Sequence, residues 1–223
     1  MTKKISYFGL SFLILLAGTF VAVSTASAGP DGKISKRSFH YNNYKYWRAG
    51  SVNAPKIGSY GKKKKSTGID IHSTISSSNI SSKVKESGVY SISFKKLKKW
   101  GVSIDNLEYA DTKASGSVKK ARKTNVNLKL LYLTIDNSPL INALNKSKKA
   151  KEFMKKSSSR VVSSIWVVVS AKVAETISSA ANLSVDYSGS KMKVKASAKT
   201  SSRTSTEITI PTGAVFAYMI DKA

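Results

Sequence analysis

Few side chains in this sequence have the types and spacing that enzyme chemistry requires. His40 and His72 are the two histidines, the 12 carboxylates are scattered singly, and there is no cysteine. The sequence has no HExxH metal motif, no Asp-x-Asp calcium loop and no Gly-x-Ser-x-Gly nucleophile motif. Residues that are distant in sequence can still assemble a catalytic site, so an enzyme is our third hypothesis, behind two kinds of binding protein. We predict no catalytic residue, no metal ion and no cofactor.

The chemical group that the chain has in abundance is the lysine ammonium. Lysines make up 33 of the 38 basic residues, which against 12 acidic residues give a net charge of +26. This excess predicts binding to an anionic surface such as a lipid membrane, a polysaccharide or nucleic acid. The candidate membrane- or anion-binding residues are Lys62, Lys63, Lys64, Lys65, Lys95, Lys96, Lys98, Lys99, Lys148, Lys149, Lys155, Lys156, Lys191, Lys193 and Lys195. The candidate interface aromatics are Tyr44, Tyr46, Trp47, Trp100 and Trp166.

The first 28 residues have the pattern of a cleaved Sec-type signal peptide. Lys3 and Lys4 form a charged start, residues 10–23 are mainly apolar, and residues 26–28 give an Ala-x-Ala cleavage site. Cleavage there would leave 36 basic against 12 acidic residues, a net charge of +24. No later apolar run approaches the roughly 20 residues of a membrane-spanning helix. We therefore predict a secreted or periplasmic protein whose partners lie outside the cytoplasm.

The segment 29–67 differs in composition from the rest of the chain. It has few aliphatic residues, clusters aromatic and basic residues between 39 and 48, and ends in a run of lysines at 62–65. We interpret it as an extended arm or edge segment with an aromatic and basic surface. Its aromatic side chains either contact an anionic partner or pack on the domain that follows. That domain, residues 68–223, is expected to be a single β-rich α+β unit.

Period-two hydrophobic patterns predict strands in the first half of that domain. Apolar residues alternate with polar ones over 69–72 and again over 90–94, and a denser apolar run over 126–135 indicates a buried strand. After it, Ser138 is a candidate N-cap and Pro139 suits the first turn of a helix, so we predict one amphipathic helix to about residue 156. The expected fold class is α+β, mainly an antiparallel sheet with this helix packed on it.

Alternation is strongest in the second half of the chain. Residues 161–177 predict one unusually long strand, and residues 183–199 predict a hairpin that turns at 188–190. On the second strand of this hairpin, Lys191, Lys193 and Lys195 share one face. The last pair of strands, 207–210 and 214–220, is separated by a Pro-Thr-Gly turn at 211–213.

The order of these elements resembles the N-terminal pore-forming domain of gasdermins over roughly residues 126–220. The most specific part of the resemblance is the closing string from Ile210-Pro211 to Ala217-Tyr218. The resemblance implies binding to acidic lipids through basic surfaces, then oligomerisation and extension of amphipathic hairpins into a β-barrel pore. A membrane-crossing strand needs only about 9–11 residues with one apolar row, a length that residues 68–104 and 161–199 provide.

Two binding functions therefore follow from the sequence. The first is an exported cationic protein that binds anionic membrane surfaces and forms a homo-oligomeric, gasdermin-like pore. The second is a non-lytic exported protein that holds an anionic polysaccharide or nucleic acid with the segment 29–67. Because lysine lacks the planar fork with which arginine recognises bases, nucleic-acid binding is expected to be non-specific and strongly salt-dependent.

Overall fold

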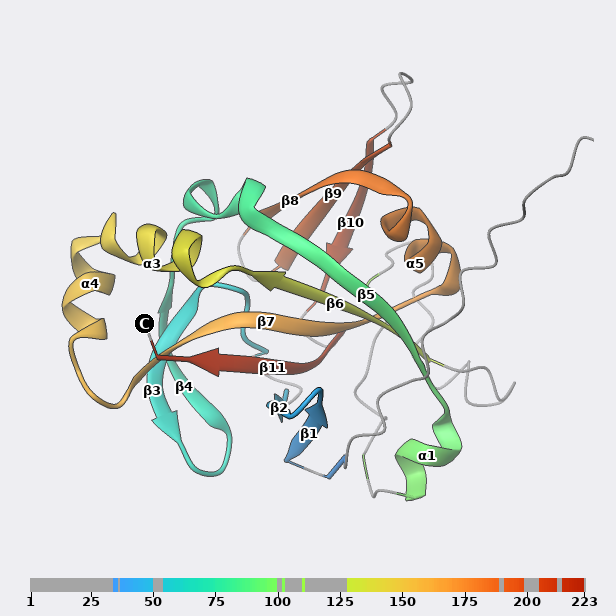
Figure 1. Ribbon diagram of the computed structural model, residues 1–223, viewed down its shortest axis with the longest axis horizontal. Helices are drawn as coiled ribbons and strands as arrows, with labels where there is room; N and C mark the ends of the chain where they lie inside the picture. Colours follow the sequence, from blue (N-terminus) through green and yellow to red (C-terminus); the bar gives the residue numbers. More distant parts are fainter. Residues whose placement is uncertain are drawn as a thin grey trace, which may run out of the picture.

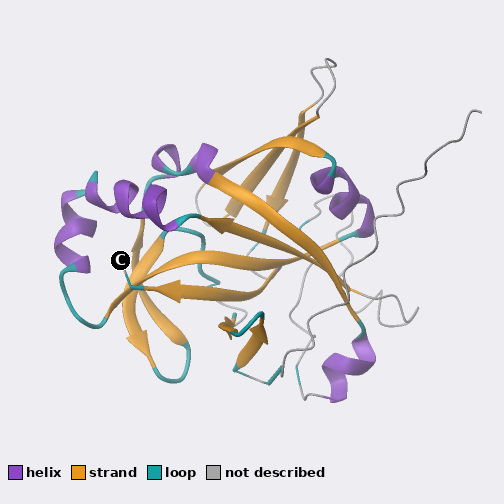
Figure 2. Cartoon of the chain, viewed as in Figure 1, coloured by secondary structure: helices purple, strands orange, loops and turns teal. Residues whose placement is uncertain are grey.

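The computed structural model describes residues 34–35, 37–49, 54–99, 102, 110, 128–188, 191–198, 205–211 and 214–222. The expected signal peptide and Trp100 lie outside these residues. The described chain forms one large antiparallel sheet, a smaller three-stranded sheet and several short helices (Figures 1 and 2). The expected α+β class with a mainly antiparallel sheet is confirmed.

The large sheet is built around β7 (Ser159–Val169). Its path runs β1 (Ser38–Tyr41), β2 (Tyr44–Arg48), β11 (Val215–Asp221), β7, β3 (Ser59–Lys64) and β4 (Gly68–Thr74). Beyond its pairing with β3, β7 also pairs with β6 (Leu128–Ile135), which pairs with β5 (Val84–Ile92). Ten of the 11 residues of β7 are buried, and Arg160 is the exception. This burial is expected for a strand with neighbours on both edges and cores on both faces.

The two faces of β7 supply two separate cores. Ile165 and Val167 point into the core that α3 and the small sheet cover, whereas Trp166 and Val168 point into the opposite core. Period-two alternation alone explains this division, because successive strand side chains project to opposite faces. The small sheet consists of β8 (Ala180–Ser188), β9 (Lys191–Ala198) and β10 (Ser205–Ile210) in the order β10-β9-β8.

The expected strand over 161–177 is wrong in its second half. β7 ends at Val169, and α5 (Ala171–Ser178) follows. The Ser170 side chain caps α5 by accepting a hydrogen bond from the Val173 N–H at 3.3 Å. Ala174 and Ile177, three residues apart, are the buried side chains of α5. The same residues fit a helical period as well as an alternating one, and the Ser170 cap favours the helix.

The single helix expected over 139–156 is two helices. α3 spans Asn137–Asn145 and α4 spans Lys148–Met154, with a break at Lys146 and Ser147. The Ser147 side chain accepts a hydrogen bond from the Ala150 N–H at 3.3 Å, so it caps a new helix. The described residues also form α1 (Phe94–Lys99) and the short 3₁₀ helices η1 (Ser77–Asn79) and η2 (Ser81–Lys83).

Two further sequence expectations differ from the structure. Strands β10 and β11 do not pair with each other, since β10 lies at an edge of the small sheet and β11 lies between β2 and β7. The described part of the segment 29–67 contributes β1, β2 and β3 to the large sheet; β1 lies at the sheet edge, as the edge-segment alternative expected, and these residues do not form an extended arm. Ring packing explains this result: Phe39 and Tyr46 are buried against Trp166, which gives the segment an apolar face of its own.

Candidate anion-binding surface

The β3–β4 hairpin presents the lysine run as an exposed turn. Lys62, Lys63 and Lys64 end β3, Lys65 begins the connection, and all four side chains are exposed. Gly68 starts β4 with φ +83°, the left-handed conformation that a three-residue hairpin connection uses. This conformation lets the chain reverse tightly after the four lysines.

Two aromatic side chains from other strands hold this turn in place. The buried Tyr218 of β11 donates its hydroxyl hydrogen bond to the Thr67 carbonyl. The Trp47 ring of β2 lies so close to Gly68 that a Cβ atom there would be 2.4 Å from the Trp47 Cγ. β2 and β4 are separated in the sheet path by β11, β7 and β3, so the contact shows that the sheet is curled. The hairpin is therefore fixed by the fold and is not a free loop.

This anchoring gives a testable consequence for Gly68. Replacing Gly68 with Ala places a methyl group against the Trp47 ring at a backbone conformation that favours glycine, and we expect a loss of about 2 kcal/mol in unfolding free energy. Chemical denaturation followed by circular dichroism measures it. The matched control is Ser66→Ala, an exposed position in the same turn, which should change stability by less than about 0.5 kcal/mol. Equal stability of the two variants would show that Trp47 does not constrain the turn.

The pKa of Tyr218 gives a second test of the same anchor. Burial raises the pKa of this phenol from 10.0 to about 12. The folded chain therefore holds the phenolic proton more tightly than the unfolded chain, so this stabilisation is complete below pH 10 and is lost between pH 10 and 12. We expect the stability gap between the wild type and Tyr218→Phe to narrow over that interval in urea denaturation. Parallel stability curves would contradict the buried phenol.

A second group of lysines lies beside the hairpin. α4 and the connection to β7 carry Lys148, Lys149, Lys151, Lys155 and Lys156, all exposed. Phe153 of α4 stacks on His72 of β4, with ring centroids 4.6 Å apart, and the Lys63 N–H donates to the Ser158 carbonyl at 2.8 Å. Tertiary structure thus joins two lysine clusters that are more than 80 residues apart in sequence.

We call this surface the basic face. It comprises the exposed lysines Lys62, Lys63, Lys64, Lys65, Lys148, Lys149, Lys151, Lys155 and Lys156; along β3, Lys62 and Lys64 project to one side of the hairpin and Lys63 to the other. Two carboxylates pair with it: Asp70 lies 3.1 Å from the Lys64 ammonium, and Glu152 lies 2.8 Å from that of Lys155. The Lys155 ammonium lowers the pKa of Glu152, so this carboxylate stays ionised at neutral pH. Since both pairs are more than half exposed and weak, the face keeps a large excess of positive charge.

The lysines of β9 do not have the same character. Lys193 and Lys195 both contact the Glu207 carboxylate of β10, at 2.8 and 3.7 Å. Asp186 of β8 lies directly across from Lys193 in the sheet. Lys191 is exposed at the start of β9. The three lysines share one face as expected, but acidic residues on both neighbouring strands reduce its positive potential.

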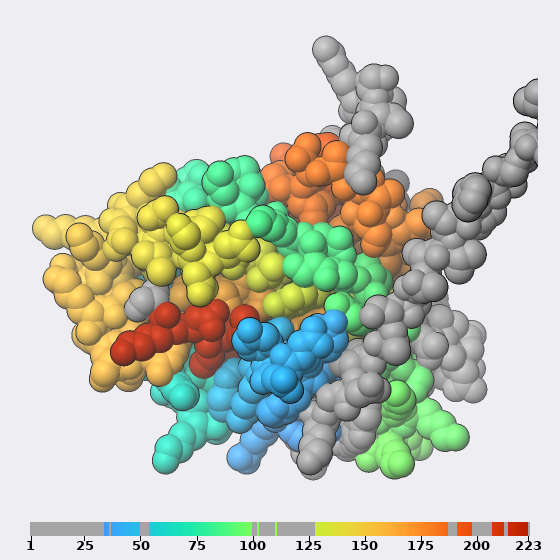
Figure 3. All heavy atoms as spheres, in the orientation of Figure 1, coloured from blue at the N-terminus to red at the C-terminus, as the bar shows by residue number. Residues whose placement is uncertain are grey.

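The lysines of α1 lie apart from the basic face. Lys95, Lys96, Lys98 and Lys99 are exposed around the buried Leu97. α1 and α4 lie at opposite ends of the long axis of the molecule (Figures 1 and 3). A flat anionic surface can therefore contact both α4 and α1 only when the long axis of the molecule lies along that surface.

The expected interface aromatics divide sharply. Trp166 is fully buried and Tyr46 is 2% exposed, so assigning these two rings to a surface was wrong. Trp47 is half-buried, and Tyr44 is 60% exposed. Trp166 stacks on Tyr132, with ring centroids 4.6 Å apart. Its position inside the continuous apolar run 165–169 is the signal that could have identified it as a core ring.

The described residues contain neither a cluster of metal ligands nor a helix of membrane-spanning length and hydrophobicity. Among them, no group of three or more histidine or acidic side chains is placed to bind a metal ion. His72 stacks on Phe153, and His40 lies on β1 opposite Lys45. Within the same ranges, no helix has both the length and the apolar character to cross a membrane.

Comparison with known proteins finds no matching family model, no matching curated protein and no matching solved structure. The fold and the surface of the described residues define an α+β protein with a concentrated cationic face. Its function is therefore inferred from the chemistry of that face.

Proposed function

We propose that this protein is exported and binds anionic lipid membranes through the basic face. The observation that carries the proposal is the meeting of nine lysines from the β3–β4 hairpin and the α4 region, with two weakly paired carboxylates among them. Lysines in disordered tails also bind membranes, but here the hairpin is held by Tyr218 and Trp47. The charges are therefore displayed together without a large ordering cost.

The magnitude of the interaction supports membrane adsorption. Each lysine near an anionic bilayer contributes about 1 kcal/mol, and seven lysines of the basic face have no carboxylate partner within the described ranges. Even if half of them reach the headgroups, the attraction corresponds to a few hundredfold enrichment at the surface. The exposed apolar contribution nearby is small, since Ile71 of β4 is only 37% exposed. Binding is thus expected to be electrostatic and reversible.

Burial of the aromatic rings disfavours the alternative of a polysaccharide- or nucleic-acid-binding protein. That alternative needs rings on which sugars or bases stack, and such stacking is worth about 1–3 kcal/mol per base. Phe39, Tyr46 and Trp166 are instead packed in the core. With these three rings in the core, the charge of the described surface suits lipid headgroups better than a stacked polymer.

We also propose pore formation as a second step, with the β8–β9 hairpin as the inserting segment. Met192, Val194 and Ala196 are buried on one face of β9, while Lys191, Lys193 and Lys195 lie on the other. This is the side-chain pattern of a strand between lipid and water. The lysine row has to face the water-filled side, because a lysine on the lipid side costs roughly 2–4 kcal/mol at mid-bilayer.

Vesicle flotation tests the first step and dye release tests the second. We expect recovery with vesicles that contain phosphatidylserine or phosphatidylglycerol, none with pure phosphatidylcholine, and release of bound protein as salt is raised. Equal recovery with neutral and anionic vesicles would overturn the electrostatic proposal. Binding without release of an encapsulated dye would overturn the pore and leave adsorption in place.

A further inference from the structure

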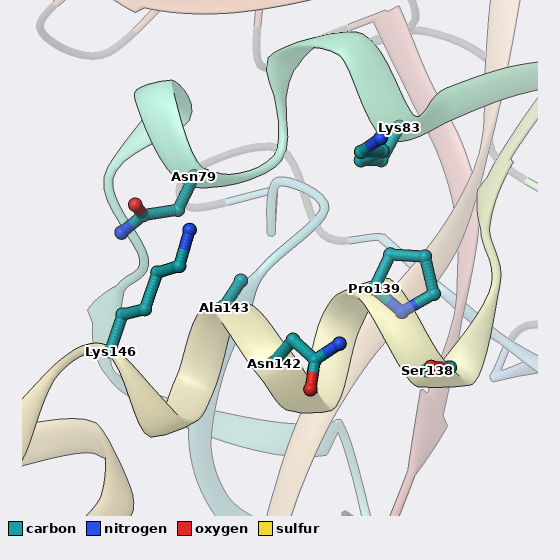
Figure 4. Close-up of a pocket in the computed structure, with 7 residues that line it drawn as sticks. All are labelled: Asn79, Lys83, Ser138, Pro139, Asn142, Ala143 and Lys146. Carbon is teal, nitrogen blue, oxygen red and sulfur yellow. The ribbon is translucent and has the colours of Figure 1, made fainter.

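We infer that a groove beside α3 is a binding site for a phosphate monoester of a small polyol, such as a sugar phosphate. The groove has a volume of about 490 Å³, within the roughly 300–1,000 Å³ of small-molecule pockets. One wall is the η1–η2 segment and the other is α3 (Figure 4). This inference is separate from membrane adsorption, because the groove is lined by residues outside the basic face.

Both walls are held by packing, so the groove exists without a ligand. On the η1–η2 side, Ile80 and Val84 are buried on either side of Lys83. On the α3 side, Leu140 and Leu144 are buried and fix the orientation of the helix. The donors that line the groove therefore project from fixed backbone, which reduces the ordering cost of binding.

The polar lining is rich in donors and lacks acids. Lys83 and Lys146 supply two ammonium groups from opposite walls, and Asn79, Ser138 and Asn142 supply amide and hydroxyl groups. In Figure 4, the Lys146 and Asn79 side chains point toward one another across the groove. No carboxylate is among the described lining residues. The lining thus matches an anion, not a cation.

Nearby carboxylates are engaged elsewhere. Asp136, which precedes α3, pairs with the Lys85 ammonium of β5. Asp186 accepts a hydrogen bond from the Ser77 hydroxyl at 3.0 Å. In the part of the chain that the structure describes, no carboxylate pairs with Lys83 or Lys146, so both ammonium groups can meet a ligand that carries the nearly double negative charge of a phosphate monoester.

The remaining lining explains why a polyol suits the site better than bare phosphate. The half-buried Pro139 gives an apolar surface on the α3 wall, against which the C–H face of a sugar can lie. The amides of Asn79 and Asn142 both donate and accept, as hydroxyl groups require. Phosphate alone would engage the lysines and leave these amides unused.

Titration calorimetry with glucose 6-phosphate, glycerol 3-phosphate, inorganic phosphate and glucose tests the site on the full chain. We expect saturable binding of at least one phosphate ester, weaker binding of inorganic phosphate, and none of glucose. The double variant Lys83→Gln/Lys146→Gln should weaken ester binding about tenfold or more, because two charge-assisted hydrogen bonds are removed. Asn142→Ala should weaken binding of the ester but not of inorganic phosphate.

The charge-matched control is Lys172→Gln/Lys222→Gln, which removes two exposed lysines outside the groove. It should bind the esters like the wild type. Equal affinity of the two double variants, or no saturable ester binding at millimolar concentration, would overturn the site. If vesicles that carry a phosphorylated inositol headgroup compete with the soluble ester for the groove, the natural ligand is a lipid headgroup. If they do not compete, the natural ligand is a soluble metabolite. Failure of this test leaves vesicle adsorption untouched, since the two measurements use different ligands.

Discussion

Charge reversal in the basic face is expected to reduce affinity for anionic vesicles about a hundredfold or more. The variant Lys63→Glu/Lys148→Glu/Lys149→Glu removes about 1 kcal/mol of attraction at each position, and the new carboxylates add repulsion. The three side chains are exposed and have no carboxylate partner among the described residues. Glutamate also suits the first turn of α4, where Lys148 and Lys149 lie, because the helix dipole favours negative charge there. The fold is therefore expected to survive.

The matched control separates a located site from general positive charge. Lys95→Glu/Lys96→Glu/Lys172→Glu changes the net charge by the same amount and also places glutamates in the first turns of helices, α1 and α5. We expect it to lose no more than a few-fold in vesicle affinity at physiological salt, where exposed charges farther apart than about 8 Å are screened. Equal losses in the two triple variants, measured by flotation over a range of lipid concentrations, would show that the basic face is not the contact surface.

Truncation of Trp166 is expected to cost about 4 kcal/mol of unfolding free energy. Trp166 is fully buried, and the rings of Phe39, Tyr46 and Tyr132 pack around it at centroid distances of 5.2, 5.6 and 4.6 Å. Replacing such a side chain with alanine removes its transfer free energy and leaves a cavity that its neighbours only partly fill. In a domain of marginal stability, this change brings Trp166→Ala close to unfolding at 37 °C.

Two further variants keep this prediction testable if Trp166→Ala does not fold. Among the described residues, the Trp166 indole N–H is buried without a hydrogen-bond partner. Trp166→Phe removes this unpaired donor together with part of the ring, so the two effects oppose each other and we expect a loss below about 2 kcal/mol. Tyr44→Ala, at a ring that is 60% exposed, should change stability by less than about 0.5 kcal/mol. Urea denaturation that gave Trp166→Phe the larger loss than Trp166→Ala would contradict a packing role.

Local sequence patterns predicted individual helices and strands better than they predicted which strands pair with one another. The apolar run before Asp136 indicated a buried strand, and β6 ends at Ile135. By contrast, residues 171–177 satisfied both a strand and a helix pattern, and the decision depended on the Ser170 cap and on which side chains the core accepted. The boundary between α3 and α4 was missed for a related reason: charge and apolar residues continue through Lys146 and Ser147 without a proline or glycine to indicate a break.

The sequence by itself determined that this protein is strongly cationic, free of cysteine and rich in alternating strands, because charge and period-two patterning are properties of the chain. Tertiary structure decided which lysines act together. The 62–65 run and the α4 lysines form one face because β3 pairs with β7 and Phe153 stacks on His72, contacts that no local pattern encodes. Tertiary structure likewise placed Trp166 in the core and Glu207 beside Lys193. Long-range strand pairing, which depends on the whole sheet, therefore turned a dispersed charge into a candidate site.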